Sequence, residues 1–322
     1  MLSRREAIVR TALAGLAAFG ARSARVTAKA AQPRVPVAFD VPSGACDCHV
    51  HIFDPDRFPF VAARSYTPEP AGIDELRALH RALHVERVVV VHPSVYGTDN
   101  SCTVNAVRQL GSNARGVAVI DERTSAAELA ELARSGIRGI RVNLMTAGVT
   151  DPAASRQRFE VAASRAKEHG WHIQFYTRPS VILAMREALE ASPVPLVFDH
   201  FGGAQASAGL NQPGLDVLLG LVRSGTAYVK LSGAYLGSSS APEYADMAPF
   251  AKAFIEANPE RVIWGTDWPH PDALPKGRRP TDLFPLLPIE DGTLMNQLAV
   301  WAPDAATRKL ILVDNPGRLY GF

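Results

Sequence analysis

The chain has 322 residues, of which 47% are apolar and 20% charged, and its formal net charge is +2. This composition is sufficient for a large buried core and excludes a disordered chain. Three cysteines are too few for a disulfide framework, so we expect Cys46, Cys48 and Cys102 to be small apolar packing residues.

Residues 1–30 have the layout of an export signal. Arg4 and Arg5 precede a weakly apolar run at 11–20, and small residues follow as far as Ala28-Lys29-Ala30. The paired arginines are typical of a twin-arginine signal, which predicts a periplasmic or exported protein. A basic N-terminal extension of a cytoplasmic protein is the alternative. The apolar run is too short to span a membrane, so no stable membrane anchoring is expected.

The formal net charge of the chain without this signal argues against nucleic acid and anionic membranes as partners. Residues 1–30 carry six positive charges and one negative charge, so the remaining chain has a formal charge of −3. A mildly acidic protein without basic runs is a poor ligand for nucleic acid or for an anionic membrane surface. We expect residues 31–44 to form a linker and residues 45–322 a single domain, and nothing in the sequence indicates its oligomeric state.

Short runs rich in β-branched and apolar residues alternate with helical patterns along the rest of the chain. The eight runs are 45–53, 87–94, 115–121, 137–144, 172–177, 195–200, 227–233 and 261–267, and helical spacing is clearest at 73–83, 102–110 and 156–169. Most of the runs are too apolar to be solvated on one face, which favours a buried parallel sheet. Eight such units predict an α/β fold of the (β/α)8 TIM-barrel type. No Gly-rich phosphate motif follows the first run, which disfavours a doubly wound open sheet.

The first run contains two histidines two residues apart. Strict strand alternation predicts that Asp47, His49 and His51 share one face, with Cys46 and Cys48 on the other. Two imidazoles that converge at a strand end can bind a metal ion or polarise a carbonyl oxygen.

Polar side chains recur at the carboxyl ends of the predicted strands, where the active site of a barrel lies. They are His49, His51, His92, Ser94, Asp121, Arg141, Asn143, Gln174, Tyr176, His200, Lys230, Ser232 and Asp267. A barrel without a site would not need polar residues at almost every strand exit.

With these residues in view, the chain resembles the amidohydrolase superfamily (amidohydrolase-2 type), in the lactonase branch that includes 2-pyrone-4,6-dicarboxylate lactonase and sulfomuconolactone hydrolase. The motifs that carry the resemblance are Asp47-Cys48-His49-Val50-His51-Ile52-Phe53-Asp54-Pro55, residues 95–100, Asp199-His200-Phe201-Gly202, residues 264–271 and residues 315–322. The resemblance implies a distorted amidohydrolase-type barrel and a hydrolase that opens a small lactone during the breakdown of aromatic compounds.

The resemblance also implies roles for individual residues. Asp267 is the expected general base that activates water, and His49, His51 and His200 surround the attacked carbonyl. Substrate-contacting positions fall on Tyr66, Ser94, Arg141 and Tyr176. Ester hydrolysis needs a base beside water and donors where the oxyanion forms, and this set supplies both.

A departure from the superfamily pattern affects the metal. Many members hold zinc through the His-x-His pair, a histidine on the fifth strand and the aspartate on the eighth, but here the fifth strand ends in Gln174 and Tyr176. We therefore expect no required cofactor, with zinc held by His49, His51 and Asp267 as the alternative.

A second departure affects the substrate. The dicarboxylate lactonase needs arginines in regions that read Met145-Thr146-Ala147-Gly148 and Ala234-Tyr235-Leu236-Gly237 here, so another anionic lactone is expected, carboxy- or sulfo-substituted or derived from a sugar acid. Arg64, Arg178 or the loop 276–279 could hold its anion. A metal-dependent decarboxylase of a ring-fission acid and an exported binding protein are the competing functions.

Overall fold

The computed structural model describes residues 30–273 and 277–322. The predicted signal therefore lies outside the described residues except for Ala30, which is buried and donates its backbone N–H to Glu75 Oε1 at 3.2 Å. The segment 31–44 has no helix or strand and runs along the domain, where the backbone N–H groups of Arg34 and Val35 donate to Glu290.

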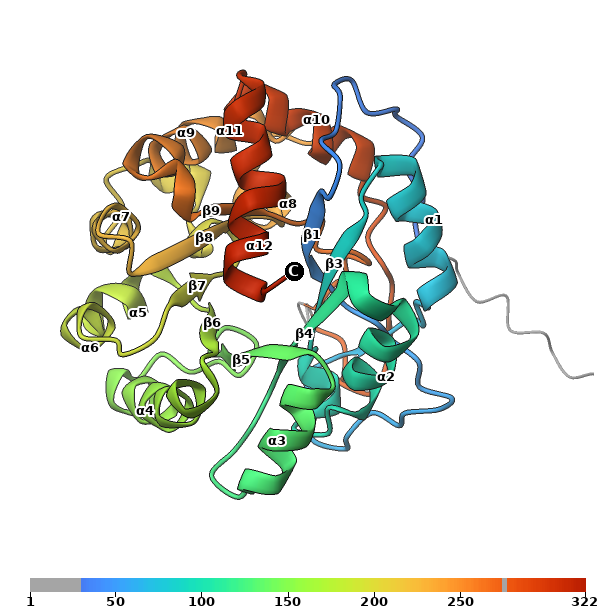
Figure 1. The fold of residues 1–322 in the computed structure, drawn as a ribbon, viewed down its shortest axis with the longest axis vertical. Helices are drawn as coiled ribbons and strands as arrows, with labels where there is room; N and C mark the ends of the chain where they lie inside the picture. Colours follow the sequence, from blue (N-terminus) through green and yellow to red (C-terminus); the bar gives the residue numbers. More distant parts are fainter. Residues whose placement is uncertain (1–29, 274–276) are drawn as a thin grey trace, which may run out of the picture.

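The predicted barrel is confirmed. Eight parallel strands pair in the order β1-β3-β4-β5-β6-β7-β8-β9, and Figure 1 shows them as a ring surrounded by helices. The strands are β1 (Cys46–Val50), β3 (Arg87–Val91), β4 (Ala114–Ala118), β5 (Ile137–Asn143), β6 (His172–Tyr176), β7 (Leu196–Phe198), β8 (Ala227–Leu231) and β9 (Val262–Trp264). Each strand begins within one residue of the start of a predicted run, since buried β-branched runs are a strong local signal, and ends one to three residues before the run does.

The helices include the three predicted from apolar spacing. They are α1 (Ile73–Leu83), α2 (Ser101–Leu110), α3 (Ala126–Arg134), α4 (Pro152–His169), α5 (Pro179–Ala184), α6 (Arg186–Glu190), α7 (Leu215–Arg223), α8 (Ala234–Gly237), α9 (Ala248–Ala257), α10 (Asp291–Trp301), α11 (Ala305–Lys309) and α12 (Asn315–Tyr320). The start of α4 is fixed by Asp151, whose carboxylate accepts from Ala154 N at 2.9 Å, and by Pro152 in the first turn. Among the described residues, no helix is long and apolar enough to cross a membrane.

The ring closes through residues that follow β9 rather than through β9 itself. His51 N donates to Trp268 O at 2.8 Å, and Asp267 N donates to His49 O at 2.9 Å. A small parallel pair that the sequence did not predict, β2 (Thr67–Pro68) with β10 (Leu283–Phe284), joins two loops beyond the barrel. This closure brings the end of the last strand beside the histidines of the first.

The barrel interior has an apolar half and a polar half. Buried strand residues form one apolar cluster with a tyrosine of the last helix: Cys46, Cys48, Val89, Val91, Val117, Val197, Tyr228, Ile263 and Tyr320. Figure 1 shows α12 across this opening of the ring. All three cysteines are free and buried, as predicted. The polar half at the strand ends holds the candidate site.

Candidate functional site

A bulge in β1 decides which side chains enter the barrel. Pairing with β3 shifts register between Asp47 and Val50. Asp47 accordingly points outward, where it accepts from Thr266 Oγ1 at 2.6 Å and lies 3.3 Å from His80 Nε2. The prediction that Asp47 shares a face with His49 is therefore wrong, because the bulge breaks strict alternation. His49 turns inward on the same side as Cys48.

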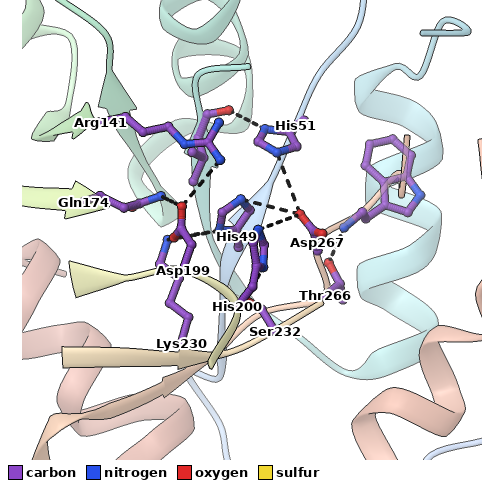
Figure 2. A network of polar contacts seen from close by, with 12 residues as sticks. His49, His51, Arg141, Gln174, Asp199, His200, Lys230, Ser232, Thr266 and Asp267 are labelled. Atoms are coloured by element: carbon purple, nitrogen blue, oxygen red, sulfur yellow. Dashed lines mark hydrogen bonds and ion pairs between the residues drawn. The ribbon is translucent and has the colours of Figure 1, made fainter. Parts of the chain in front are cut away.

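Three imidazoles converge on one carboxylate oxygen, as Figure 2 shows. The Nε2 atoms of His49, His51 and His200 lie 3.5, 3.8 and 3.8 Å from Asp267 Oδ1. Asp267 and His200 both have positive φ, at 69° and 52°, a region that non-glycine residues seldom occupy. These loop conformations aim both side chains at the strand-one histidines. The four residues expected to be catalytic are thus brought together.

Hydrogen bonds to the outer nitrogens restrict what the imidazoles can do. His51 Nδ1 lies 2.7 Å from Val91 O, which can only accept, so Nδ1 carries the proton and Nε2 of the neutral ring is an acceptor. Burial holds the pKa of His49 and of His51 well below the usual range, so both rings are neutral. His200 Nδ1 lies 3.0 Å from Ser232 Oγ, a group that can donate or accept. His200 can therefore present an Nε2–H to the cavity.

Behind His49 lies a buried ion network centred on Asp199. Its carboxylate is 3.3 Å from Lys230 Nζ, 3.4 Å from Arg141, 3.1 Å from Gln174 Nε2 and 3.2 Å from His49 Nδ1. Burial alone would raise the pKa of Asp199, but Lys230 and then His49 hold it well below its usual range. Burial lowers the pKa of Lys230 and Asp199 opposes this effect. The network fixes the position of His49 from below.

The sequence did not predict that these residues contact one another. Asp199 belongs to the Asp199-His200-Phe201-Gly202 motif, and Lys230 and Gln174 are polar residues near strand ends. Their partners are distant in the chain, with Lys230 and His49 separated by 181 positions. A signal was present, because a lysine in an otherwise apolar buried strand requires a buried anion.

The expected substrate-contacting residues line one cavity of about 690 Å³ together with the catalytic set. Tyr66, Ser94, Arg141 and Tyr176 face this cavity alongside His51, His200 and Asp267. His49 lies beneath it and is fully buried. An adjoining cavity of about 770 Å³ shares Ser94 and Arg141 with it.

The arginines that could bind an anion differ in the cavity that they line and in the groups that they contact. Arg141 is buried and donates to His92 O at 3.1 Å as well as facing Asp199. Arg178 lines the catalytic cavity, whereas Arg64 lines the adjoining one and donates to Thr67 Oγ1. In the loop 276–279, Arg278 pairs with Asp272 at 3.7 Å and Arg279 with Asp282 at 2.8 Å, and Lys276 lies outside the described residues.

Tyr235 was not predicted as a site residue. Its hydroxyl donates to Asp267 Oδ2 at 2.7 Å, and burial raises its pKa well above the usual range, so it stays protonated. The chain reaches Tyr235 through Gly233, where a Cβ would lie 2.7 Å from His200 Nδ1. With Oδ2 held by Tyr235, Asp267 presents Oδ1 to the imidazoles. Tyr235 therefore orients the carboxylate.

The residues present also fit a metal ion. One ligand atom each from His49, His51 and Asp267 lies within 4.8 Å of the others, and all three are buried. An unprotonated Nε2 beside a carboxylate oxygen needs a proton or a cation between them. Two histidines and one carboxylate with a free position are a donor set that suits zinc.

This site places the chain in a family. Residues 46–322 match the amidohydrolase family model, and the chain belongs to that family. It is 35% identical over 287 residues to a 4-sulfomuconolactone hydrolase of Rhizobium radiobacter, covering 89% of this chain and 93% of the relative. It is 35% identical over 300 residues to a 2-pyrone-4,6-dicarboxylate hydrolase of Comamonas testosteroni, covering 90% and 94%. These relatives are lactone hydrolases.

A solved structure supports the fold. The chain matches the apo crystal structure of Agrobacterium tumefaciens ATU3138 with a TM-score of 0.75 and 26% sequence identity. The match covers 91% of this chain and 97% of that one.

Proposed function

We propose that this protein hydrolyses the ring ester of a small anionic lactone. The observation that carries the proposal is the carboxylate of Asp267, which faces three imidazoles at the floor of a cavity lined by hydroxyl and guanidinium donors. The lactone hydrolases among its relatives support the same reaction class and a role in the breakdown of aromatic compounds. The ring is of the muconolactone or pyrone kind, or that of a sugar-acid lactone.

In the proposed reaction, Asp267 Oδ1 accepts a proton from water as the water oxygen attacks the carbonyl carbon. The resulting oxyanion needs donors, and His200 Nε2–H and the Tyr176 hydroxyl both line the cavity. The ring C–O bond then breaks, and the leaving oxygen takes the proton from Asp267. Hydrolysis thus adds one water and yields a hydroxyl group and a carboxylic acid, which ionises to a carboxylate by releasing one proton to solvent.

The histidines divide the work in this scheme. Neutral His51 has an acceptor at Nε2 and orients the water rather than the carbonyl oxygen. His49 Nδ1 lies between Asp199 Oδ1 at 3.2 Å and Lys230 Nζ at 3.3 Å, so this ring can hold its proton on either nitrogen. His200 polarises the carbonyl. Burial raises the pKa of Tyr66 to about 12, which keeps it a donor to the substrate.

We propose that metal is not obligatory. Where zinc is bound, His49, His51 and Asp267 would hold it, and it would supply Lewis-acid activation of water. Tyr235 and Asp199 would then orient Asp267 and His49 as ligands. Protein purified without added metal should be active without stoichiometric zinc. Loss of activity on chelation, with recovery on adding zinc alone, would contradict this.

A panel assay tests the function. The purified protein should open at least one anionic lactone, with a product heavier by one water, and should release no carbon dioxide. Carbon dioxide release from a ring-fission acid would support the decarboxylase instead. Tight lactone binding without turnover would support an exported binding protein.

We also propose export, on the basis of Arg4, Arg5 and Ala28-Lys29-Ala30. The protein isolated from the periplasm of its host should begin after the signal, and lysine at both arginine positions should block a twin-arginine route. A mature chain that begins at Met1 and stays in the cytoplasm would contradict export.

A further inference from the structure

The floor of the catalytic cavity is electrically balanced by its own residues. Four charged side chains lie there, the cations Lys230 and Arg141 and the anions Asp199 and Asp267. Three of them form a continuous network, since Asp199 lies 3.3 Å from Lys230 and 3.4 Å from Arg141. Two cations thus face two anions among these four side chains. An anionic substrate therefore needs a further cation.

The mouth of the cavity offers a further cation. Asp272 and Arg278 pair at 3.7 Å, and their charges cancel. Arg178 lines the cavity, and no carboxylate of the described residues lies within ion-pair distance of it. Its one side-chain contact is from Nε to Met145 Sδ at 3.2 Å, which leaves both terminal nitrogens for a ligand. Arg178 follows Tyr176, the last residue of β6, by two positions, and both residues line the cavity.

An apolar wall forms another part of the cavity lining. It consists of Ala204, Leu236, Pro271, Ala273 and Leu287, with the charged residue Asp272 between Pro271 and Ala273. Leu236 is 38% exposed and lines the cavity, so it offers an apolar surface to a bound molecule. A second anionic substituent would meet Asp267 or Asp272, and the arginine beside Asp272, Arg278, is already paired with that carboxylate.

We infer that the cavity takes lactones with a single anionic substituent, which Arg178 holds, and an uncharged remainder that packs on the wall around Leu236. This inference rests on the proposed lactone hydrolysis and names its substrate class. A guanidinium can bind a carboxylate through two parallel hydrogen bonds, which makes Arg178 a specificity residue rather than a diffuse source of charge.

Binding of ring analogues tests the inference separately from catalysis. Pyridones that carry none, one or two carboxylates copy a pyrone lactone, but their lactam ring resists hydrolysis. By calorimetry, the monocarboxylate should bind about 10-fold or more tighter than the other two. Arg178→Met should remove about 10-fold or more of this affinity while leaving the uncharged pyridone within about twofold. Arg178→Lys should retain part of the preference.

Arg158→Met is the matched control, because Arg158 is another exposed arginine and lines the adjoining cavity. It should leave the preference unchanged. Equal losses in both arginine variants, an unchanged preference in Arg178→Met, or tightest binding of the dicarboxylate would each overturn the inference. Pyrone lactones with the same three charge states are assayed in parallel. If none is hydrolysed although the pyridones show the monoanion preference, the proposed hydrolysis fails and the role of Arg178 stands.

Discussion

The two halves of the barrel interior differ although the same strands build both. Tyr228 and Lys230 lie two positions apart on β8 and point the same way. Tyr228 joins the apolar cluster that Tyr320 closes, whereas Lys230 joins the ion network under His49. Burial of apolar side chains stabilises the first half, but the second requires charges to be taken out of water. The apolar half therefore stabilises the fold, and this stabilisation offsets the free-energy cost of burying charges in the polar half.

Both halves of the barrel interior also contain buried polar atoms without a hydrogen-bond partner. In the polar half, His49 Nε2 and Gln174 Oε1 are buried without a hydrogen-bond partner of standard geometry. Each unsatisfied atom costs about 1–3 kcal/mol, a cost that substrate or a bound ion can offset. In the apolar half, both ring nitrogens of His172 and the hydroxyl of Tyr320 are also without a partner, and the two rings pack edge-on at 5.2 Å between centroids.

The largest expected effect is on catalysis. Asp267→Asn keeps the shape of the side chain and removes the base, so kcat should fall by about 10²–10⁴-fold while thermal stability changes little. The control in the apolar half is Ile263→Val in β9, which should cost about 0.5–1.5 kcal/mol of stability and leave kcat unchanged. Steady-state kinetics and thermal unfolding measure both. A loss of kcat below about 10-fold in Asp267→Asn would mean another base acts.

The next effect is on stability in the polar half. Lys230→Met leaves Asp199 buried beside fewer cations, and breaking a buried ion pair costs about 3–5 kcal/mol. Tyr228→Phe, two positions away, removes only a hydroxyl group and should cost less than about 1 kcal/mol. Urea unfolding of both variants gives the two free energies. Equal costs would show that the network contributes no more than ordinary packing.

The smallest effect, taken per titrating group and per pH unit, is a dependence of stability on pH. Burial lowers the pKa of His172 to about 3 and that of His92 to about 4, from an ordinary value of 6.5. Below the ordinary value the unfolded chain binds protons that the folded chain does not, so stability falls as the pH falls. The slope is up to about 1.4 kcal/mol per pH unit for each group. Denaturant unfolding between pH 6.5 and pH 4 should show it.

A variant identifies the source of this slope. His172→Leu removes one titrating group and should flatten the dependence, whereas a solvated histidine such as His84, replaced by Gln, should leave it unchanged. An unchanged slope in His172→Leu would show that His172 does not contribute.

The sequence by itself determined the barrel and pointed to most residues of the candidate site. Runs such as Arg87–Val91 and His172–Tyr176 carry their strand signal locally, and apolar spacing gave α1 its observed bounds. Strand-end polar residues then pointed to His51 and Asp267, because the carboxyl ends of parallel strands meet at one rim.

Tertiary structure alone decided the orientation, the contacts and the charge states of those residues. The bulge that turns Asp47 outward depends on the register between β1 and β3, which no local pattern encodes. The ion network of Asp199 and Lys230 and the hydrogen bond from Tyr235 to Asp267 join residues from different strands and loops. The charge state of an imidazole depends on what buries it and what lies beside it. Those neighbours are set by the closed ring and not by the order of residues in the chain.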